Sequence, residues 1–166
     1  MAINWGLIST ADINGKLLAG AALSDEVVIL AVGSRDADRA AAYARQHGIE
    51  RAYGSYDELL ADPDIQAVYN PLPNTMHSEW SIRALEAGKH VLCEKPFSSH
   101  PQEVADAFDV AERTGLGLAE AFMWRHNPQT KKLAELVAGG AVGELRLIRS
   151  TFSYALFDAD NIRLRT

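Results

Sequence analysis

Glu94 and Lys95 are the residues whose types and position best suit them to chemistry. They follow an apolar run, Val91-Leu92-Cys93, that is typical of a buried strand, and Pro96 comes directly after them. A lysine at the tip of a central strand, partly desolvated and beside an acid, can have its pKa tuned and can be aimed at a substrate oxygen. The alternative is a surface ion pair in a turn that Pro96 fixes, and this segment alone favours that alternative.

A second group follows the first apolar run, in the segment "ISTADIN". A dinucleotide-binding fingerprint has glycine at the positions that Ser9, Ala11 and Asn14 occupy here. The backbone amides that open the next helix still attract phosphate, because their N–H groups are unpaired and the helix dipole is positive there. We therefore take Ser9, Thr10, Ala11 and Ile13 as candidate cofactor contacts, although an ordinary strand, turn and helix would fit this segment equally well.

A third group, in "GSRDADR", follows the second apolar run. Folds that prefer NAD place an acid here to bind the ribose, whereas an arginine suits the 2′-phosphate of NADP. Ser34 and Arg35 offer a hydroxyl and a planar guanidinium, a plausible phosphate clamp, and Arg39 is a further candidate contact. The alternative is that Arg35 is a solvated residue at the start of a helix.

A fourth group lies in "NPLPNTMH", where two prolines stiffen the chain after a buried run. A rigid loop at this point could lie over a bound cofactor, and we take Leu72, Pro73, Asn74 and His77 as candidate contacts. In structural terms alone, such a histidine more often caps or packs a helix. We expect His77 to belong to the cofactor pocket rather than to carry a proton.

The elements that position these groups alternate between short apolar runs and helical patterns, which is typical of βαβ units with a parallel sheet. The predicted fold is α/β, a doubly wound Rossmann domain, in which ligands bind outside the carboxyl ends of the strands. We expect strands at 3–8, 26–33, 51–53, 65–69, 89–93 and 117–122, and helices at 12–22, 36–47, 76–87, 101–114 and, after a capping box at Ser55 and Glu58, a shorter one.

The pattern changes after residue 122. An amphipathic helix is predicted at 129–138 and a long strand of a different sheet at 144–154. We therefore divide the chain into a nucleotide-binding domain, 1–122, and the beginning of an incomplete mixed α/β domain, 123–166. If the strand lacks sheet partners, Leu145, Leu147, Phe152 and Tyr154 should be exposed or paired with another chain.

Composition excludes several classes of protein. The net charge is −6, and the 16 basic residues are scattered rather than striped, so we expect no nucleic-acid partner. The chain opens without a signal peptide and has no membrane-length apolar run, so we expect a cytoplasmic protein with no membrane partner. Its single cysteine, Cys93, can form no intramolecular disulfide and leaves no thiolate metal site, so we expect a buried hydrophobic residue and no metal.

Taken together, these segments resemble the Gfo/Idh/MocA family, the glucose-fructose oxidoreductase and inositol dehydrogenase type of NAD(P)-dependent oxidoreductase. The matching segments are "WGLIST", "SRDADRAAAYA", "AVYNPLPNTMHSEWSIRALEAGKHVLCEKPFS" and "EAFMWRHNP". The third segment, with Glu94-Lys95-Pro96, is the most specific. The resemblance extends over essentially the whole chain and is strongest to the dihydrodiol and xylose dehydrogenase branch.

The resemblance implies a Rossmann domain that binds NADP, or NAD, and a second domain that closes the active site and forms a homo-oligomer in the full-length protein. Lys95 would contact the substrate hydroxyl and assist proton transfer, and Glu94 would line the cofactor pocket. Trp124 and Arg125 would lie where the chain passes the nicotinamide. Family members are longer, and a Tyr or His beyond Thr166 would complete their catalytic set.

The activity implied is hydride transfer between the nicotinamide and a hydroxyl carbon of a sugar, polyol or cyclic diol. We expect these 166 residues to bind the cofactor but to turn over slowly or not at all. The alternative is a non-catalytic relative that binds NADP(H) or regulates a partner. The glutamate-lysine-proline segment argues against that alternative, because a sensor needs the phosphate contacts and not the lysine.

Overall fold

The chain forms two compact units, Met1–Phe122 and Met123–Thr166, and a computed structural model describes residues 2–155 and 157. The first unit contains the strands β1 (Ile3–Ile8), β2 (Val27–Gly33), β3 (Arg51–Tyr53), β4 (Ala67–Asn70), β5 (His90–Cys93) and β6 (Leu118–Glu120). Its helices are α1 (Asn14–Ala21), α2 (Ala37–His47), α3 (Tyr56–Ala61), the 3-10 helix η1 (Asn74–Met76), α4 (His77–Glu86) and α5 (Pro101–Thr114).

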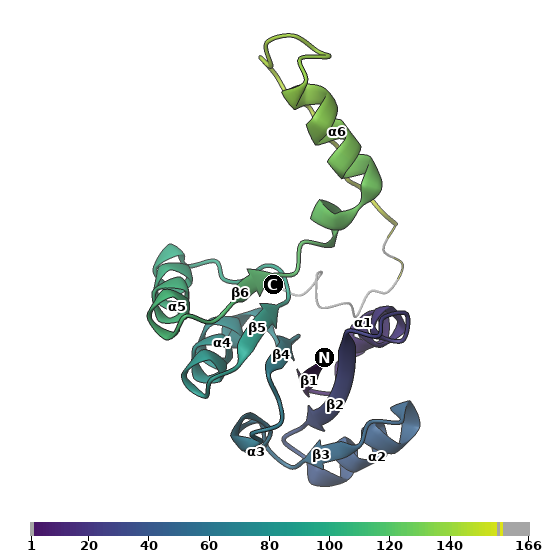
Figure 1. Cartoon of the computed structure of the whole chain (residues 1–166), viewed down its shortest axis with the longest axis vertical. Coiled ribbons are helices and arrows are strands. Elements are labelled where there is room, and N and C mark those ends of the chain that lie inside the picture. Colours follow the sequence, from purple (N-terminus) through teal and green to yellow (C-terminus); the bar gives the residue numbers. More distant parts are fainter. Residues whose placement is uncertain (1, 156, 158–166) are drawn as a thin grey trace. The chain divides into compact units, whose positions relative to one another are not determined.

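The six strands form one parallel sheet in the order β3-β2-β1-β4-β5-β6 (Figure 1). The order reverses between β1 and β4, which is the switch point of a doubly wound fold. The predicted fold class is therefore confirmed. β1 and β3 have their predicted bounds, and the other strands differ from prediction by one or two residues at an end.

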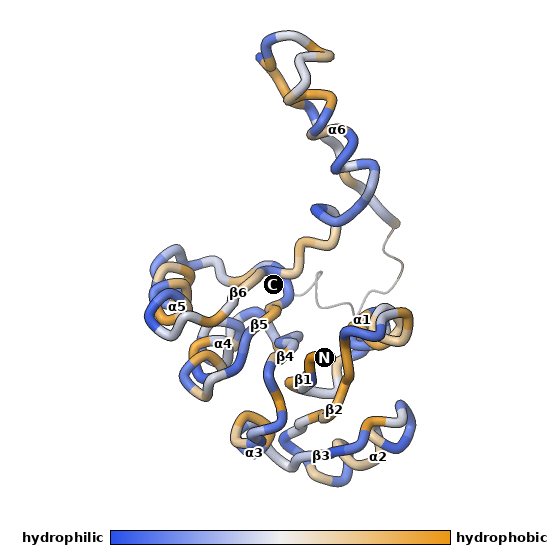
Figure 2. The backbone as a smooth tube through the Cα atoms, viewed as in Figure 1, coloured by the Kyte–Doolittle hydropathy of each residue, from blue (hydrophilic) through white to orange (hydrophobic). Residues whose placement is uncertain are grey.

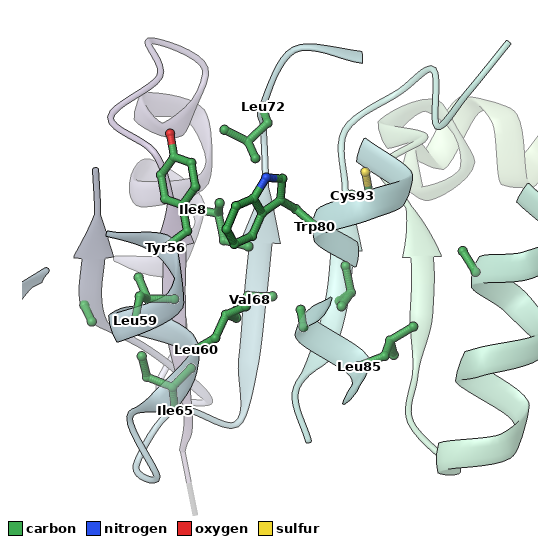
Figure 3. Packing of buried hydrophobic residues seen from close by; sticks show 14 of the residues in the cluster. Ile8, Tyr56, Leu59, Leu60, Ile65, Val68, Leu72, Trp80, Leu85 and Cys93 are labelled. Atoms are coloured by element: carbon green, nitrogen blue, oxygen red, sulfur yellow. The ribbon is translucent and has the colours of Figure 1, made fainter. Parts of the chain in front are cut away.

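Each face of the sheet carries its own apolar core. On one face Ile8 and Val68 pack with residues of α3, α4 and α5, among them Leu59 and Trp80 (Figure 3). On the other face Leu7 packs with Ala44 of α2 and with partly buried residues of α1. Consecutive residues of a strand point to opposite faces, so the apolar run of β1 supplies both cores.

Local signals in the sequence explain where the helices begin and end. Ser55 Oγ accepts a hydrogen bond from Glu58 N at 3.1 Å, as predicted for a capping box. The Glu58 carboxylate accepts its hydrogen bond from Gly54 N, at 3.0 Å, rather than from the N–H group of Ser55. Helix α2 ends at Gly48, whose φ of 66° is in the left-handed region that suits glycine. These caps set the points at which the loops between helix and strand begin.

The second unit contains the 3-10 helix η2 (Met123–His126) and α6 (Pro128–Ala138). Along α6, hydrophilic and hydrophobic residues alternate, as Figure 2 shows. The strand predicted at 144–154 is wrong, because the structure has no regular secondary structure there. A strand needs a neighbour for its ladder hydrogen bonds, and this segment pairs with none in the part of the chain that the structure describes.

The predicted exposure of that segment is confirmed. The exposed fractions of Leu145, Leu147, Phe152 and Tyr154 are 48%, 68%, 89% and 58%. Their side chains therefore leave an apolar surface open to water. Among the described residues, no helix combines the length and apolar character that crossing a membrane requires.

Candidate functional site

The four predicted groups follow β1, β2, β4 and β5, so the fold brings them to the carboxyl edge of one sheet (Figure 1). The groups after β1 and β4 flank the switch point, where the loops of a doubly wound sheet diverge and leave room for a ligand. The adenosine half of a dinucleotide would lie toward β2 and β3, and the nicotinamide half toward β4 and β5.

The turn after β1 holds Ser9 in a conformation that normally belongs to glycine, with φ at 98°. Asn14 is fully buried, and its Nδ2 donates a hydrogen bond to Ser9 O at 2.9 Å. The Ser9 hydroxyl and the Asn14 side-chain oxygen are both buried, and neither has a hydrogen-bond partner among the residues that the structure describes. Strained backbone and unpaired buried polar atoms are costly, and such features cluster at functional sites.

The loop after β2 brings Ser34 together with Arg39, one of the candidate cations. Ser34 is 2% exposed, and its Oγ accepts hydrogen bonds from Asp36 N and Arg39 Nε, both at 3.3 Å. Arg35 is exposed. The structure therefore brings Arg39 to Ser34, and the phosphate clamp of Ser34 and Arg35 stays a prediction.

A cleft of about 460 Å³ lies between the turn after β1 and helix α2. Thr10 and Arg39 both line it, together with Asp12 and Tyr43. Burial raises the pKa of the Tyr43 hydroxyl, with a further contribution from nearby Asp12, so this phenol stays protonated near neutral pH. The cleft thus presents hydroxyl groups and a guanidinium at the adenosine side of the switch point.

The loop after β4 is fixed by two buried polar side chains. Asn70 Nδ2 donates to His77 O at 3.1 Å and to Ser81 Oγ at 3.2 Å, and its Oδ1 accepts from Leu72 N at 3.3 Å. His77 is 1% exposed, with Nε2 2.7 Å from Leu72 O and Nδ1 2.8 Å from Pro96 O. His77 therefore links the loops after β4 and β5.

Of the other candidates in this loop, Leu72 is buried, whereas Pro73 and Asn74 are exposed at the edge of the sheet. A ligand could reach these two residues directly. His77, in contrast, has both ring nitrogens occupied by main-chain carbonyls, so its contribution to a site is through the loops that it joins.

Lys95 is exposed at the tip of β5, so the expected partial desolvation of its side chain is wrong. Its neighbour Glu94 is turned to other partners, since Glu94 Oε1 accepts from the Tyr69 hydroxyl at 2.7 Å and Glu94 Oε2 from Lys95 N at 3.1 Å. Burial, reinforced by Glu94, raises the pKa of Tyr69, so the tyrosine is the donor in this pair. Within residues 2–155 and 157 the ammonium of Lys95 has no side-chain or main-chain partner, so a ligand could meet it there.

Sequence reasoning missed Tyr69 and Glu120. Glu120 is the last residue of β6, and its Oε1 accepts a hydrogen bond from Phe97 N at 2.9 Å. An acid that ends a strand is the same signal that drew attention to Glu94, so it could have been found. Tyr69 reads as an ordinary aromatic residue of a buried strand, and nothing in the sequence marks its hydroxyl.

Two further predictions concern Cys93 and two residues of η2. Cys93 is fully buried in the core, where burial raises the pKa of its thiol to about 12, so the prediction of a buried hydrophobic residue is confirmed. Trp124 and Arg125 are exposed residues of η2 in the second unit, and their place beside a nicotinamide stays a prediction. Across residues 2–155 and 157, His, Cys, Asp and Glu side chains form no group of three or more that could hold a metal ion.

The fold and the loops at its carboxyl edge define a Rossmann-type dinucleotide-binding protein. Residues 3–122 match the family described as "Oxidoreductase family, NAD-binding Rossmann fold" (GFO_IDH_MocA), and the chain belongs to this family. The resemblance inferred from the sequence is therefore confirmed.

The chain is similar in sequence to two named dehydrogenases. It is 45% identical over 161 residues to a D-xylose 1-dehydrogenase (NADP(+)) of Haloferax volcanii, covering 96% of this chain and 49% of that protein. It is 36% identical over 154 residues to the trans-1,2-dihydrobenzene-1,2-diol dehydrogenase of Bos taurus, covering 92% and 46%.

A similar solved structure is a mutant of KijD10, a 3-ketoreductase from Actinomadura kijaniata, in complex with TDP-benzene and NADP. The TM-score is 0.79 at 39% identity, and the match covers 88% of this chain and 45% of that one. The chain thus spans about half the length of the relatives that it matches.

Proposed function

We propose that the chain is the cofactor-binding part of an NADP-preferring oxidoreductase acting on a hydroxyl carbon of a sugar, polyol or cyclic diol, with NAD as a possible second cofactor. The observation that carries the proposal is the exposed Lys95 at the carboxyl edge of β5, on the nicotinamide side of the switch point. The names of its relatives support the same chemistry, since they include a D-xylose 1-dehydrogenase (NADP(+)) and a trans-1,2-dihydrobenzene-1,2-diol dehydrogenase.

The residues of the first unit suit each part of the cofactor. Main-chain N–H groups at the start of α1, beside Thr10 and Ala11, would bind the pyrophosphate. Arg39, oriented by Ser34, would meet the 2′-phosphate from within the cleft, with exposed Arg35 as a second cation. Leu72, Pro73 and Asn74 would line the nicotinamide side.

Lys95 would act on the substrate. The nicotinamide supplies or accepts the hydride when it is bound. The Lys95 ammonium would donate a hydrogen bond to the reacting oxygen and stabilise the negative charge that develops there as the hydroxyl proton leaves. Glu94, fixed by Tyr69, would contribute negative charge beside the nicotinamide side of the edge.

The whole protein would use further parts. We assign residues 123–166 to the beginning of a substrate and dimerisation domain, in which Trp124 and Arg125 would approach the nicotinamide. The exposed apolar side chains at 145–154 support a homo-oligomer, because such surfaces are normally covered. We place the protein in the cytoplasm, where NADP-dependent sugar chemistry has its cofactor.

The test is a titration of the purified chain with NADPH and NADH, followed by intrinsic fluorescence. We expect NADPH to bind more tightly than NADH, and Arg39→Ala to weaken NADPH binding roughly tenfold or more through loss of a charge-assisted contact to phosphate. Arg35→Ala measures the second cation in the same way. Arg45→Ala, an exposed arginine of the same helix, is the matched control and should leave the affinity unchanged.

Equal affinity for the two cofactors, or no effect of either arginine, would contradict the NADP preference. Catalysis has its own arm, in which sugar-dependent formation of NADPH is measured with the protein and with Lys95→Met. Cofactor binding without any turnover, unchanged by Lys95→Met, would favour the non-catalytic NADP(H)-binding alternative.

A further inference from the structure

Side chains of other residues hold the main chain of the segment Lys95-Pro96-Phe97 at each of its three residues. Lys95 N donates to Glu94 Oε2 at 3.1 Å. Pro96 O lies 2.8 Å from His77 Nδ1, and Phe97 N donates to Glu120 Oε1 at 2.9 Å. Proline has no N–H, so these contacts occupy both N–H groups of the segment and its central carbonyl.

The side chains that hold the segment are themselves held. The hydroxyl of Tyr69, a residue of β4 that is 3% exposed, donates a hydrogen bond to the Glu94 carboxylate. His77 is 1% exposed and contacts Leu72 O through its second nitrogen. The contacts therefore reach into the sheet and into helix α4, which are the rigid parts of the fold.

The C-terminal end of the segment is anchored in two ways. Phe97 is 3% exposed and belongs to the apolar core, with its ring 6.3 Å from that of Phe108 on α5. Glu120 pairs in register with Cys93, so its carboxylate is carried by the strand next to β5. The Lys95 side chain, in contrast, is exposed.

We propose that Tyr69, His77 and Glu120 are positioning residues that fix the main chain of Lys95, Pro96 and Phe97, so that the Lys95 ammonium reaches one place on the nicotinamide side of the site. The proposal rests on the function proposed above, because it assigns these residues to the lysine of that reaction. Tyr69 acts through Glu94, His77 on Pro96 O, and Glu120 on Phe97 N.

The physical reason lies in the length of the lysine side chain. Its flexible four-carbon stem multiplies any rotation of the main chain at Cα, and a small misplacement of a reacting group costs much of its catalytic effect. Lys95 N belongs to the peptide group before Lys95, whereas Pro96 O and Phe97 N belong to the peptide group after Pro96. Holding these two groups restricts the direction in which the lysine stem leaves the chain. Only the rotations of the stem itself then remain to be restricted by the bound substrate.

The experiment measures amide hydrogen exchange of Lys95 and Phe97 by NMR in the full chain, without cofactor. Glu120→Ala removes the acceptor of Phe97 N, and we expect exchange at Phe97 to rise roughly tenfold, the effect of losing one buried hydrogen bond. Glu120→Gln keeps a side-chain oxygen at the same position and should restore slow exchange. Glu112→Ala, an exposed glutamate of α5, is the matched control and should leave exchange unchanged.

A second variant tests the other end without opening a large cavity. Tyr69→Phe keeps the buried ring and removes only the hydroxyl that holds Glu94. Relative to the wild type, we therefore expect exchange to accelerate more at Lys95 than at Phe97. Thermal unfolding of each variant separates this local loosening from a loss of the whole fold. Equal exchange in the wild type, Glu120→Ala and Tyr69→Phe would overturn the proposal, as would equal acceleration by Glu120→Ala and Glu120→Gln.

The effect on the site is read from the ¹³Cε resonance of Lys95 as NADPH is added. We expect a shift in the wild type and in Glu120→Gln, and a smaller shift in Glu120→Ala at an unchanged NADPH affinity. An undiminished shift in Glu120→Ala would overturn the positioning role. Failure of the wild type to bind NADPH would instead contradict the proposed function, while the exchange measurement would still decide whether Glu120 and Tyr69 fix the segment.

Discussion

Ser9 carries two unfavourable features of the turn after β1 in a single residue. Its φ of 98° is a conformation that costs a non-glycine residue about 1 to 3 kcal/mol. Its hydroxyl is buried without a partner. The sequence showed only that a glycine was missing at this position, whereas the structure shows that the backbone adopts the glycine conformation nonetheless.

We predict that Ser9→Gly stabilises the chain by about 1 kcal/mol, because glycine relieves the strain and removes the unpaired hydroxyl, at a smaller cost in chain entropy. Urea unfolding of the apo chain measures this change. Ser99→Gly, at an exposed serine with negative φ, should be neutral or destabilising. A loss of stability in Ser9→Gly would mean that the serine side chain supports the turn.

The sequence predicted the types of residue at the site better than their pairings. Ser34 and Arg39 are five residues apart, and Tyr69 and Glu94 are 25 apart. Spacing along the chain cannot reveal such contacts, because the turn of α2 and the register of β4 with β5 bring these side chains together. The alternative reading of Glu94 and Lys95 was a surface ion pair, yet the Glu94 carboxylate contacts the Tyr69 hydroxyl and Lys95 N instead.

At the scale of elements, the sequence predicted best the strands whose residues point alternately into the two cores. The six strands were predicted close to their observed bounds, because buried parallel strands read as short apolar runs between helix caps. The predicted strand at 144–154 failed for the complementary reason, since β-propensity describes how a residue fits a sheet and supplies no partner strand.

A polar cluster surrounds Asp62, at the end of α3, and connects elements near the amino ends of the strands, opposite the four candidate groups. Arg51 Nη1 donates to both carboxylate oxygens of Asp62, at 3.0 and 2.8 Å, and the Tyr53 hydroxyl donates at 2.7 Å. Lys89 Nζ donates to Asp62 O at 2.6 Å and to Ile65 O at 2.8 Å. The cluster ties β3, α3 and the starts of β4 and β5 together.

This cluster predicts how stability depends on pH. Burial acts to raise the pKa of Asp62, but the hydrogen bonds from Arg51 and Tyr53 outweigh burial and hold that pKa below its ordinary value. The carboxylate therefore stabilises the fold above the ordinary aspartate pKa, and this contribution is lost as the pH falls through the lowered pKa.

We expect Asp62→Asn to destabilise the chain at neutral pH and to flatten the fall in stability at acidic pH. Urea unfolding of both proteins from neutral pH to below the ordinary aspartate pKa measures the difference. Asp109→Asn, at an exposed residue of α5, should follow the wild type. A variant curve parallel to the wild type throughout would contradict the role given to Asp62.

At the scale of the whole molecule, the two units differ in how their apolar residues are covered. The first unit contains two buried apolar cores, whereas Leu147, Ile148 and Phe152 of the second unit are 68%, 73% and 89% exposed. Several exposed apolar side chains in one short segment favour association, because covering them removes apolar surface from water. The four candidate groups that follow β1, β2, β4 and β5 belong to the first unit.

We therefore predict that the chain self-associates through the second unit and that cofactor binding is independent of this association. Leu147→Lys combined with Phe152→Lys should reduce concentration-dependent sedimentation, since charged side chains resist burial, while the NADPH affinity stays within about twofold of the wild type. Gln129→Lys combined with Ala134→Lys, which adds the same two charges at exposed residues of α6, controls for net charge. If the double variant sediments as the wild type does, the segment is not the associating surface; if it loses NADPH affinity, the second unit contributes to the cofactor site directly.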